Sequence, residues 1–131
     1  MNSFYILKRH STYPSTFDIV KKKGGYMLNQ VILVGRLVYD PELRETDTNK
    51  KVANITIAVQ RPFKNAESGE YDTDFFRCTL WEGIAESTAK YCKKGKMLAI
   101  KARLAQQQHV CSDEKSFTYP EIIVEKVSFI S

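Results

Sequence analysis

The clearest alternation of apolar and polar positions runs over residues 51–60. Its apolar members are Val52, Ile55, Ile57 and Val59. Small or polar residues stand between them, which is the pattern of a β-strand that buries one face. Arg61-Pro62 ends the alternation and a polar tip follows. Residues 61–72 are therefore predicted to form a long, exposed hairpin loop.

Two neighbouring segments also predict strands. Residues 28–39 are rich in Val, Ile and Leu and contain Gly35, which predicts a strand with a bulge or a sharp bend. Asp40-Pro41-Glu42 then marks a turn or the start of a loop. Residues 73–81 predict a third strand with two different faces. One face carries Phe75, Arg77, Thr79 and Trp81, and the other carries Phe76, Cys78 and Leu80.

Over residues 82–94 the apolar period changes to that of a helix. The predicted buried stripe consists of Ile84, Ala85, Thr88, Tyr91 and Cys92. Lysines near the end of this segment suit the negative end of a helix dipole, and we expect Gly95 to provide the C-terminal cap.

Residues 96–106 and 117–129 predict a fourth and a fifth strand, joined by a polar turn over residues 110–116. The order is three strands, one helix and two strands. It matches a mainly all-β chain with the oligonucleotide/oligosaccharide-binding (OB) fold, a five-stranded Greek-key barrel with one α-helix between strands three and four. An SH3-like barrel is the main competitor, but it has no three-turn helix at this point.

The charge of the chain is unevenly distributed. The 131 residues include 20 basic and 15 acidic ones, for a formal net charge of +5. Five of the basic residues and one acidic residue lie within residues 1–26, which leaves 15 basic and 14 acidic residues in the remainder. Bulk charge is therefore weak support for nucleic-acid binding. What matters is whether the fold gathers basic side chains on one face.

Several classes of function are disfavoured. No apolar run of about 18 residues predicts a membrane-spanning helix. Cys78, Cys92 and Cys111 are odd in number and lack metal-site spacing, which indicates buried or free thiols in a reducing cytoplasm. With only His10 and His109, a zinc site is not expected. The carboxylates are scattered, and no catalytic triad context or phosphate-binding glycine loop is present. We expect no enzyme activity, no cofactor and no metal.

Non-specific binding of a nucleic-acid strand requires flat rings on which bases stack and cations that follow the backbone. The predicted loop offers Arg61, Phe63 and Lys64 within four residues. A phenyl ring beside a polar loop tip has no obvious structural purpose, so Phe63 is a candidate stacking residue.

The third strand offers Phe75, Arg77 and Trp81 on one face. An alternative is that Phe75 and Trp81 belong to the core and Arg77 points outward alone. That arrangement would bury a charge on the same face, which the alternation disfavours. The residues alone leave both interpretations open.

Three ordered segments carry a family resemblance: Asn29-Gln-Val-Ile-Leu-Val-Gly-Arg-Leu37, Asp40-Pro-Glu-Leu-Arg44 and Val52-Ala-Asn-Ile-Thr-Ile-Ala-Val59. They resemble the opening of bacterial-type single-stranded DNA-binding proteins, the SSB family, in its short form. The resemblance runs from about residue 27 to residue 131. It implies sequence-independent binding and protection of single-stranded DNA during replication, recombination, repair or uptake, by a cytoplasmic, nucleoid-associated protein.

The resemblance also implies the binding residues. Stacking aromatics of the family fall at Phe63, Phe75 and Trp81, and a fourth falls at His109, which stacks less well than the family's tryptophan. Basic family positions are kept at Arg36, Arg44, Arg77 and Lys94. Other basic positions are replaced by Gln30, Ala105 and Gln107. We therefore expect weaker affinity and a shallower salt dependence than in a typical member.

Family members assemble as homotetramers, which implies the same here. The first predicted strand is apolar on both faces over residues 31–34, more than one small barrel needs. Typical full-length members continue into a linker and an acidic tail that recruits partners. The chain stops at Ser131, so no tail-mediated recruitment is expected. The alternative function is a protein–protein adaptor of a replication-restart or phage complex, built on the same barrel, with weak DNA binding.

Residues 1–26 form an expected extension of a domain over residues 27–131. They show no clean periodicity, which suggests disorder or a mis-assigned start. Lys-Lys-Gly-Gly-Tyr directly before Met27 can be encoded by codons that contain AGGAGG, the appearance of a ribosome-binding site translated by mistake. The alternative is a basic, flexible arm that touches phosphates.

Overall fold

The computed structural model describes residues 20–22, 25–110 and 116–130. The chain divides into two units, residues 1–30 and 31–131, each described by itself. In the first unit, β1 (Val20–Lys22) pairs antiparallel with β2 (Gly25–Met27). The expectation of disorder over residues 1–26 falls mainly on residues outside the described set.

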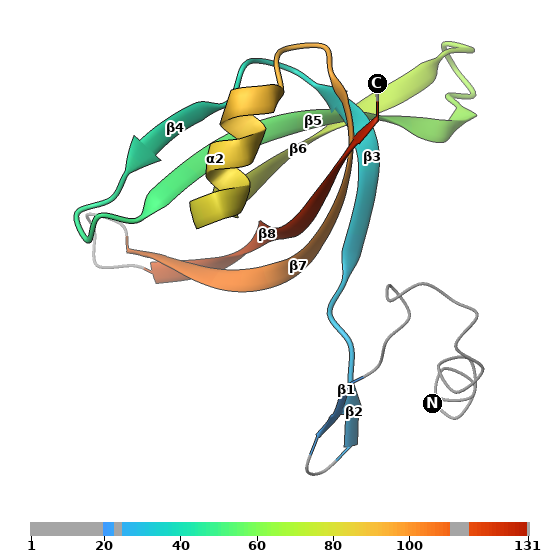
Figure 1. Cartoon of the computed structure of the whole chain (residues 1–131). Coiled ribbons are helices and arrows are strands. Elements are labelled where there is room, and N and C mark those ends of the chain that lie inside the picture. Colours follow the sequence, from blue (N-terminus) through green and yellow to red (C-terminus); the bar gives the residue numbers. More distant parts are fainter. Residues whose placement is uncertain (1–19, 23–24, 111–115, 131) are drawn as a thin grey trace. The chain divides into compact units, whose positions relative to one another are not determined.

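The second unit is a closed β-barrel with one described helix (Figure 1). Its elements are β3 (Val31–Leu37), β4 (Glu42–Glu45), β5 (Lys51–Lys64), β6 (Tyr71–Trp81), α2 (Glu82–Tyr91), β7 (Met97–Val110) and β8 (Ser116–Ile130). The strand order is β3-β7-β8-β6-β5-β4, and an additional pairing of β3 with β5 closes the barrel. The helix lies between the third and fourth barrel strands, β6 and β7. The predicted OB fold is confirmed.

Closure depends on Gly35. Residues 31–36 of β3 pair with β7 without a register shift, and Arg36 and Leu37 also pair with β5. A Cβ atom on Gly35 would overlap the carbonyl oxygen of Ala58 and the Cγ2 atom of Ile57. Glycine is needed here because the β5 backbone crosses so closely. The sequence predicted a bulge or a bend, and the unbroken register excludes the bulge.

The barrel interior is filled by the apolar faces that the alternation predicted. Its largest fully buried side chains include Leu37, Ile55, Ile57, Leu80, Leu98 and Ile100. Along β6, Cys78 and Leu80 are fully buried, whereas Phe75 and Arg77 are exposed. The predicted faces of the second and third strands are confirmed.

Helix α2 packs across β5 but differs from its prediction at the C-terminal end. It ends at Tyr91, and Cys92 in an extended conformation is the C-cap. Gly95, the predicted cap, lies beyond the helix at a φ of 92° and donates its N–H to Leu37 O at 2.8 Å. Tyr91 is 59% exposed, so its placement on the buried stripe was wrong. Thr88 and Cys92 on either side of it are fully buried, so the buried stripe itself continues to the end of the helix.

Strands β5 to β8 are all longer than their predictions, β8 by only one residue at each end, and β4 was not predicted. Half of the predicted loop over residues 61–72 is strand, because β5 continues to Lys64 and β6 begins at Tyr71. Strand β7 extends past the predicted end at Gln106 to Val110. Strand β4 follows the predicted turn and pairs with β5. The predicted turn over residues 110–116 falls largely on residues 111–115, which lie outside the described set.

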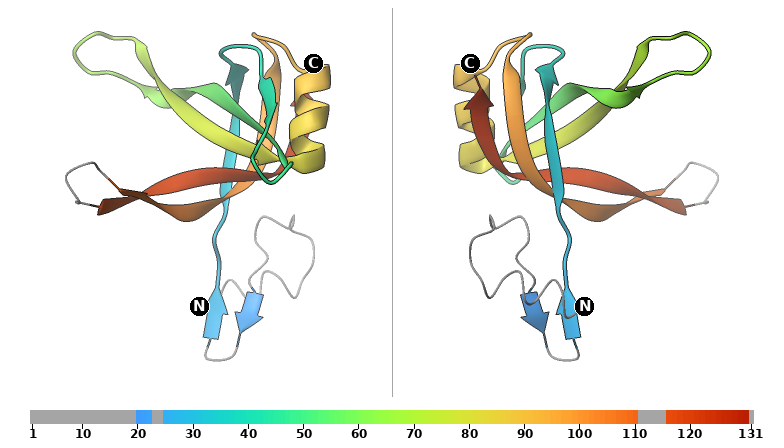
Figure 2. Two further views of the ribbon diagram at one scale, coloured as in Figure 1. Left: turned by 90° about the vertical axis from the view of Figure 1, so that its left-hand side faces the viewer. Right: turned by 90° about the vertical axis from the view of Figure 1, so that its right-hand side faces the viewer.

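The long strands form two arms. The β5–β6 arm comprises residues 60–64 and 71–74, and the β7–β8 arm comprises residues 104–110 and 116–121. Both arms project from the side of the barrel opposite α2 (Figure 2). In the described part of the chain, no helix has the length and apolar character required to cross a membrane.

Candidate nucleic-acid interface

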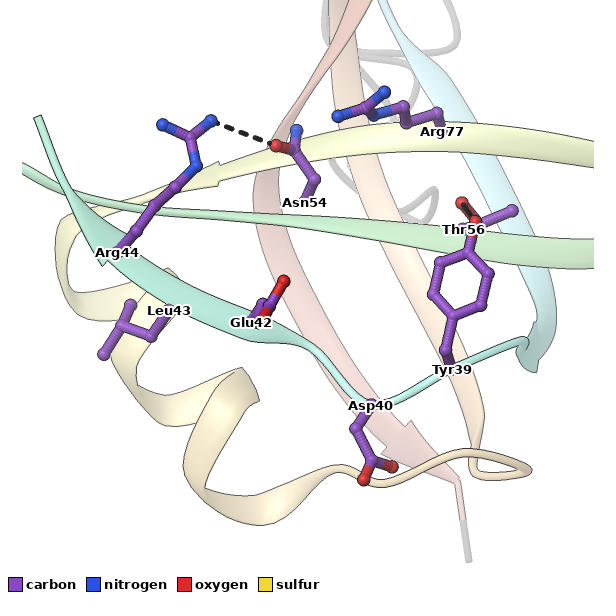
Figure 3. Close-up of a pocket in the computed structure, with 8 residues that line it drawn as sticks. All are labelled: Tyr39, Asp40, Glu42, Leu43, Arg44, Asn54, Thr56 and Arg77. Carbon is purple, nitrogen blue, oxygen red and sulfur yellow. Dashed lines mark hydrogen bonds between the residues drawn. The ribbon is translucent and has the colours of Figure 1, made fainter.

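Two adjoining depressions form one groove on the outer surface of β4, β5 and β6. The first has a volume of about 520 Å³ and the second about 480 Å³. Both are lined by Arg44, Asn54 and Arg77, so they are parts of one continuous surface, here called the groove. The first part also contains Tyr39, Asp40, Glu42, Leu43 and Thr56 (Figure 3). The second also contains Trp81, Thr79, Val52, Tyr119, Pro120 and Glu121.

The register of β5 and β6 places the groove side chains on one face. Thr56 lies opposite Arg77, Asn54 opposite Thr79, and Val52 opposite Trp81. Directly opposed residues of an antiparallel pair point to the same side of the sheet. The row on β6 is therefore Phe75, Arg77, Thr79 and Trp81, as the alternation predicted.

The aromatic side chains of β6 are accessible. Phe75 is 63% exposed, so the alternative that makes it a core residue is wrong. Trp81 is 37% exposed and stands opposite the buried Val52, so its side chain is partly covered and partly open. A ring held in this way is ready to accept a base without losing much conformational freedom.

Asn54 connects the floor of the groove. Its Oδ1 accepts a hydrogen bond from Arg44 Nη2 at 3.2 Å, and its Nδ2 donates to Thr79 Oγ1 at 3.1 Å. These bonds hold the guanidinium of Arg44 over β5 (Figure 3). Among the residues that the structure describes, no side chain pairs with the guanidinium of Arg77. Both cations face the groove and can bind an anion.

Arg61, in contrast, is paired within the β5–β6 arm. Its guanidinium donates to both carboxylate oxygens of Asp74 at distances of 2.9 to 3.2 Å. The hydrogen bond from Arg61 lowers the pKa of Asp74, and the same contact raises the pKa of Arg61. The cation predicted to contact phosphate is thus already neutralised by a carboxylate.

The other two predicted residues of this arm remain accessible. Phe63 is 62% exposed near the tip of β5. The Nζ atom of Lys64 lies 5.8 Å from the ring centroid of Tyr71, a cation–π distance that leaves the ammonium in solvent. The arm therefore presents the ring of Phe63 and the ammonium of Lys64 to a ligand.

Arg36, Lys94 and His109 do not line the groove. The Nη1 atom of Arg36 donates to Gly95 O at 2.7 Å, near the end of β3. Lys94 is exposed, and its backbone N–H donates to Asp40 Oδ1 at 2.7 Å. His109 lies on the β7–β8 arm, opposite Phe117. The structure thus gathers Arg44, Arg77 and Trp81 in the groove and places Phe75 beside Arg77 on β6. Arg36, Lys94 and His109 lie outside the groove.

Sequence reasoning missed two tyrosines of the groove. Tyr39 is 55% exposed, and its hydroxyl shares a 3.0 Å hydrogen bond with Thr56 Oγ1. Tyr119 is 42% exposed and lines the second part of the groove. Tyr39 directly precedes the predicted turn, and Tyr119 alternates with Phe117 at the exposed end of a predicted strand. The alternation of Tyr119 with Phe117 was the signal in the sequence that could have indicated its exposure.

The same residues offer little for covalent chemistry. Burial raises the pKa of the Cys78 thiol to about 12, so the nucleophilic thiolate is scarce near neutral pH. Within the described residues, no cluster of His, Cys, Asp or Glu could hold a metal ion. The groove combines aromatic rings, on which unpaired bases can stack, with guanidinium groups, which can bind phosphates.

A closed five-stranded barrel that carries such a groove defines an OB-fold of the oligonucleotide-binding class. Comparison with known proteins identifies the family within this class. Residues 28–130 match the Single-strand binding protein family, and the chain belongs to this family.

Its curated relatives include "Single-stranded DNA-binding protein B" of Bacillus subtilis, 42% identical over 79% of this chain and 91% of that protein. "Single-stranded DNA-binding protein 3" of Listeria innocua is 42% identical over 79% of this chain and 64% of its own length. The protein of Halalkalibacterium halodurans named "Single-stranded DNA-binding protein" is 41% identical, and the match spans 61% of it. The chain thus matches less than two thirds of the two longer relatives.

Proposed function

We propose that the protein binds single-stranded DNA with little sequence preference. Bases stack on Phe63, Phe75 and Trp81, and phosphates contact Arg44 and Arg77. The observation that carries the proposal is the exposed row on β6. There the guanidinium of Arg77, which pairs with no side chain of the described residues, stands between Phe75 and Trp81. Membership of the family and the names of the relatives support it.

The role that follows is protection of unpaired strands during DNA replication, recombination, repair or uptake, in the cytoplasm and at the nucleoid. The function is one of binding, without catalysis. The alternative of a protein–protein adaptor gains no support from the family or from the relatives. An adaptor would also have no use for exposed rings beside the guanidinium groups of Arg44 and Arg77.

The proposal is tested by fluorescence anisotropy with labelled oligo(dT). We expect Phe75→Ala to weaken binding by about 1–3 kcal/mol, the usual value of one stacked base. Its unfolding free energy should change little, because the ring is 63% exposed. The control is Tyr91→Ala on α2, which removes a ring of 59% exposure that lines neither part of the groove.

Quenching of Trp81 fluorescence during the same titration gives a second measurement. Absence of binding by the wild-type protein at low salt contradicts the proposal. Equal affinities of Phe75→Ala and Tyr91→Ala contradict the assignment of Phe75.

We further propose that the barrel assembles into a homotetramer, so that one strand contacts several grooves. The support is the outer face of β3, where Ile32 and Val34 are each 48% exposed although they are aliphatic. Light scattering on the wild-type protein measures the mass of the assembly, and a monomer contradicts this proposal.

For the N-terminal residues, we propose that the DNA-binding domain comprises residues 27–131. The family match from residue 28 supports this boundary. The intact mass of the protein purified from its own cell tests whether residues 1–26 belong to it.

A further inference from the structure

The β5–β6 arm contains an irregularity in its strand pairing at Phe63. Gln60 pairs with Thr73 before the irregularity, and Lys64 pairs with Tyr71 after it. Between these two pairs β5 has three residues, whereas β6 has one. Extra residues in one strand form a β-bulge, which bends the strand and redirects a side chain. Phe63 is the last of the three residues and is 62% exposed, so packing in the core does not fix its ring.

Side-chain contacts connect the bulge to β6 on both sides of Phe63. On one side, the guanidinium of Arg61 donates to both carboxylate oxygens of Asp74 at 2.9 to 3.2 Å. On the other side, Asn65 Nδ2 donates to Asp72 Oδ2 at 3.0 Å. The same oxygen of Asp72 lies 4.0 Å from Arg61 Nη1. Two aspartates of β6 thus hold the chain before and after the ring.

The backbone on either side of the ring is restricted as well. The Oδ1 atom of Asn65 accepts hydrogen bonds from the backbone N–H groups of Glu67 at 2.8 Å and Ser68 at 3.3 Å. Its own N–H donates to Glu70 O at 2.8 Å, which closes the turn at the tip of the arm. Within the bulge, the ring of Pro62 fixes one backbone dihedral. The segment that carries Phe63 therefore has little conformational freedom.

The pair of Arg61 with Asp74 contributes more to geometry than to the stability of the fold. The two side chains are 44% and 36% exposed, and an exposed ion pair contributes little to folding stability. Two parallel hydrogen bonds between a guanidinium and a carboxylate do, however, fix the relative position of the groups. A ligand binds more tightly to a side chain that is already in place, because less order has to be created during binding.

We propose that Arg61 and Asp74 are positioning residues, whose ion pair fixes the bulge of β5 so that Phe63 is presented to an unpaired base before the DNA strand arrives. The hydrogen bond from Asn65 to Asp72 fixes the other end of the same segment. This inference rests on the proposed function, because it takes Phe63 as a base-stacking residue. Arg61 then contributes to binding through Phe63 and not by contact with a phosphate.

The test compares affinities for oligo(dT) by fluorescence anisotropy at low salt, where an exposed ion pair is screened least. Arg61→Thr with Asp74→Thr removes the pair without a change in net charge, and threonine suits a strand. This double variant should bind about 2- to 12-fold more weakly, the usual cost of ordering one side chain during binding. In a Phe63→Ala background the same double substitution should cause no further loss, because no ring remains to be positioned.

A second exposed ion pair provides the matched control. Lys51 Nζ lies 2.8 Å from Glu45 Oε1, the two side chains are 38% and 52% exposed, and neither residue lines the groove. Lys51→Thr with Glu45→Thr also leaves the net charge unchanged and should bind oligo(dT) like the wild type. A loss equal to that of the arm variant would show that the effect is not particular to the arm, which overturns the inference.

The cycle distinguishes the inference from the proposed function. If Arg61→Thr with Asp74→Thr binds like the wild type, or if its loss persists in the Phe63→Ala background, the pair does not act through Phe63. The inference is then overturned, while binding by the wild type still supports the proposed function. If Phe63→Ala alone binds like the wild type, there is no ring to position and the inference also fails. If the wild type does not bind oligo(dT), the proposed function itself fails.

A reporter variant measures the positioning directly. Phe63→Trp in a Trp81→Phe background places the only indole of the chain on the arm. In the free protein, time-resolved fluorescence anisotropy should show faster local motion of this indole when Arg61 and Asp74 are both replaced by threonine. Unchanged motion overturns the inference.

A second variant decides the case in which the double threonine variant does not fold. Asn65→Asp keeps acceptors for the backbone of the turn but places a carboxylate against Asp72 in place of a donor. It should increase the motion of the indole at position 63 in the same reporter background. An indole that is equally restricted in this variant overturns the inference.

Discussion

Among individual residues, two buried threonines have opposite environments. Thr79 is 7% exposed, and its Oγ1 accepts a hydrogen bond from Asn54 Nδ2 at 3.1 Å. Thr88 in α2 is fully buried, and its Oγ1 has no hydrogen-bond partner among the described residues. A buried hydroxyl without a partner costs about 1–3 kcal/mol. Thr88 is therefore a position where the sequence is not optimal for stability.

We expect Thr88→Val to raise the free energy of unfolding by about 1 kcal/mol, because valine has nearly the same shape and no hydroxyl to desolvate. Thr79→Val is the matched control and should lower it by a similar amount, because the amide of Asn54 loses its acceptor. Urea denaturation followed by circular dichroism measures both. A destabilised Thr88→Val variant would mean that its hydroxyl has a partner in solution.

For individual residues, the sequence predicted which side chains share a face of a strand, but it did not predict which side chains form ion pairs. The alternation predicted that Phe75 and Arg77 share a face, because that face is a local property of the strand, whereas the exposure of Phe75 was left open by the residues alone. The ion pair of Arg61 with Asp74 depends on how residues 60–64 align with β6, where the register shifts between Gln60 and Lys64. A local sequence pattern does not specify that register.

At the scale of elements, the arms explain why strand lengths were underestimated. Pro62 was expected to end β5, yet the strand continues to Lys64. In the arm, β5 has β6 as its neighbour on one side, so the missing N–H of a proline can face solvent. The helix was predicted well at its start, whereas its end depends on where Gly95 meets Leu37 across the barrel.

The prediction at the scale of elements concerns the close crossing of β3 and β5. We expect Gly35→Ala to lower the free energy of unfolding by about 1–3 kcal/mol or more, as overpacking does, because the new methyl group meets backbone that cannot move aside. Even its next contact, Val59 Cγ2, would be at only 2.9 Å. The measurement is urea denaturation.

Gly83→Ala is the control for this crossing. An added Cβ there meets nothing within 4 Å, and the residue lies in the first turn of α2. Helix propensity favours alanine over glycine by about 0.5–1 kcal/mol, so this variant should be unchanged or more stable. Equal losses in the two variants would show that β5 does not constrain Gly35.

At the scale of the whole molecule, the arrangement of the charges is more important for DNA binding than the net charge. Glu45 pairs with Lys51 at 2.8 Å, and Arg61 pairs with Asp74, so these groups largely cancel. Arg44 and Arg77 lie in the groove with no carboxylate partner among the described residues. The groove also contains the carboxylates of Asp40, Glu42 and Glu121, so the positions of the two guanidinium groups, and not the summed charge, decide where a phosphate can bind.

This arrangement predicts the salt dependence of DNA binding. Replacing Arg77 with Gln should reduce the slope of log K against log salt by about 0.7, the value of one phosphate contact on a single strand. The double variant Arg61→Gln with Asp74→Asn should keep the wild-type slope, because it removes a charge pair of zero net charge. Anisotropy titrations at several salt concentrations measure both slopes. An equal reduction in the two variants would mean that Arg61 contacts phosphate despite Asp74.

The sequence alone determined the barrel class, the order of its strands and helix, and the faces of β5 and β6. Each of these follows from a period of two or of about 3.6 residues, which is a property of the local backbone. Only the tertiary structure decided that Tyr39 and Tyr119 line one groove with Trp81, and that Arg61 is paired with a carboxylate. The reason is that barrel closure and strand register bring residues together across long separations in the chain, and no local pattern records those distances.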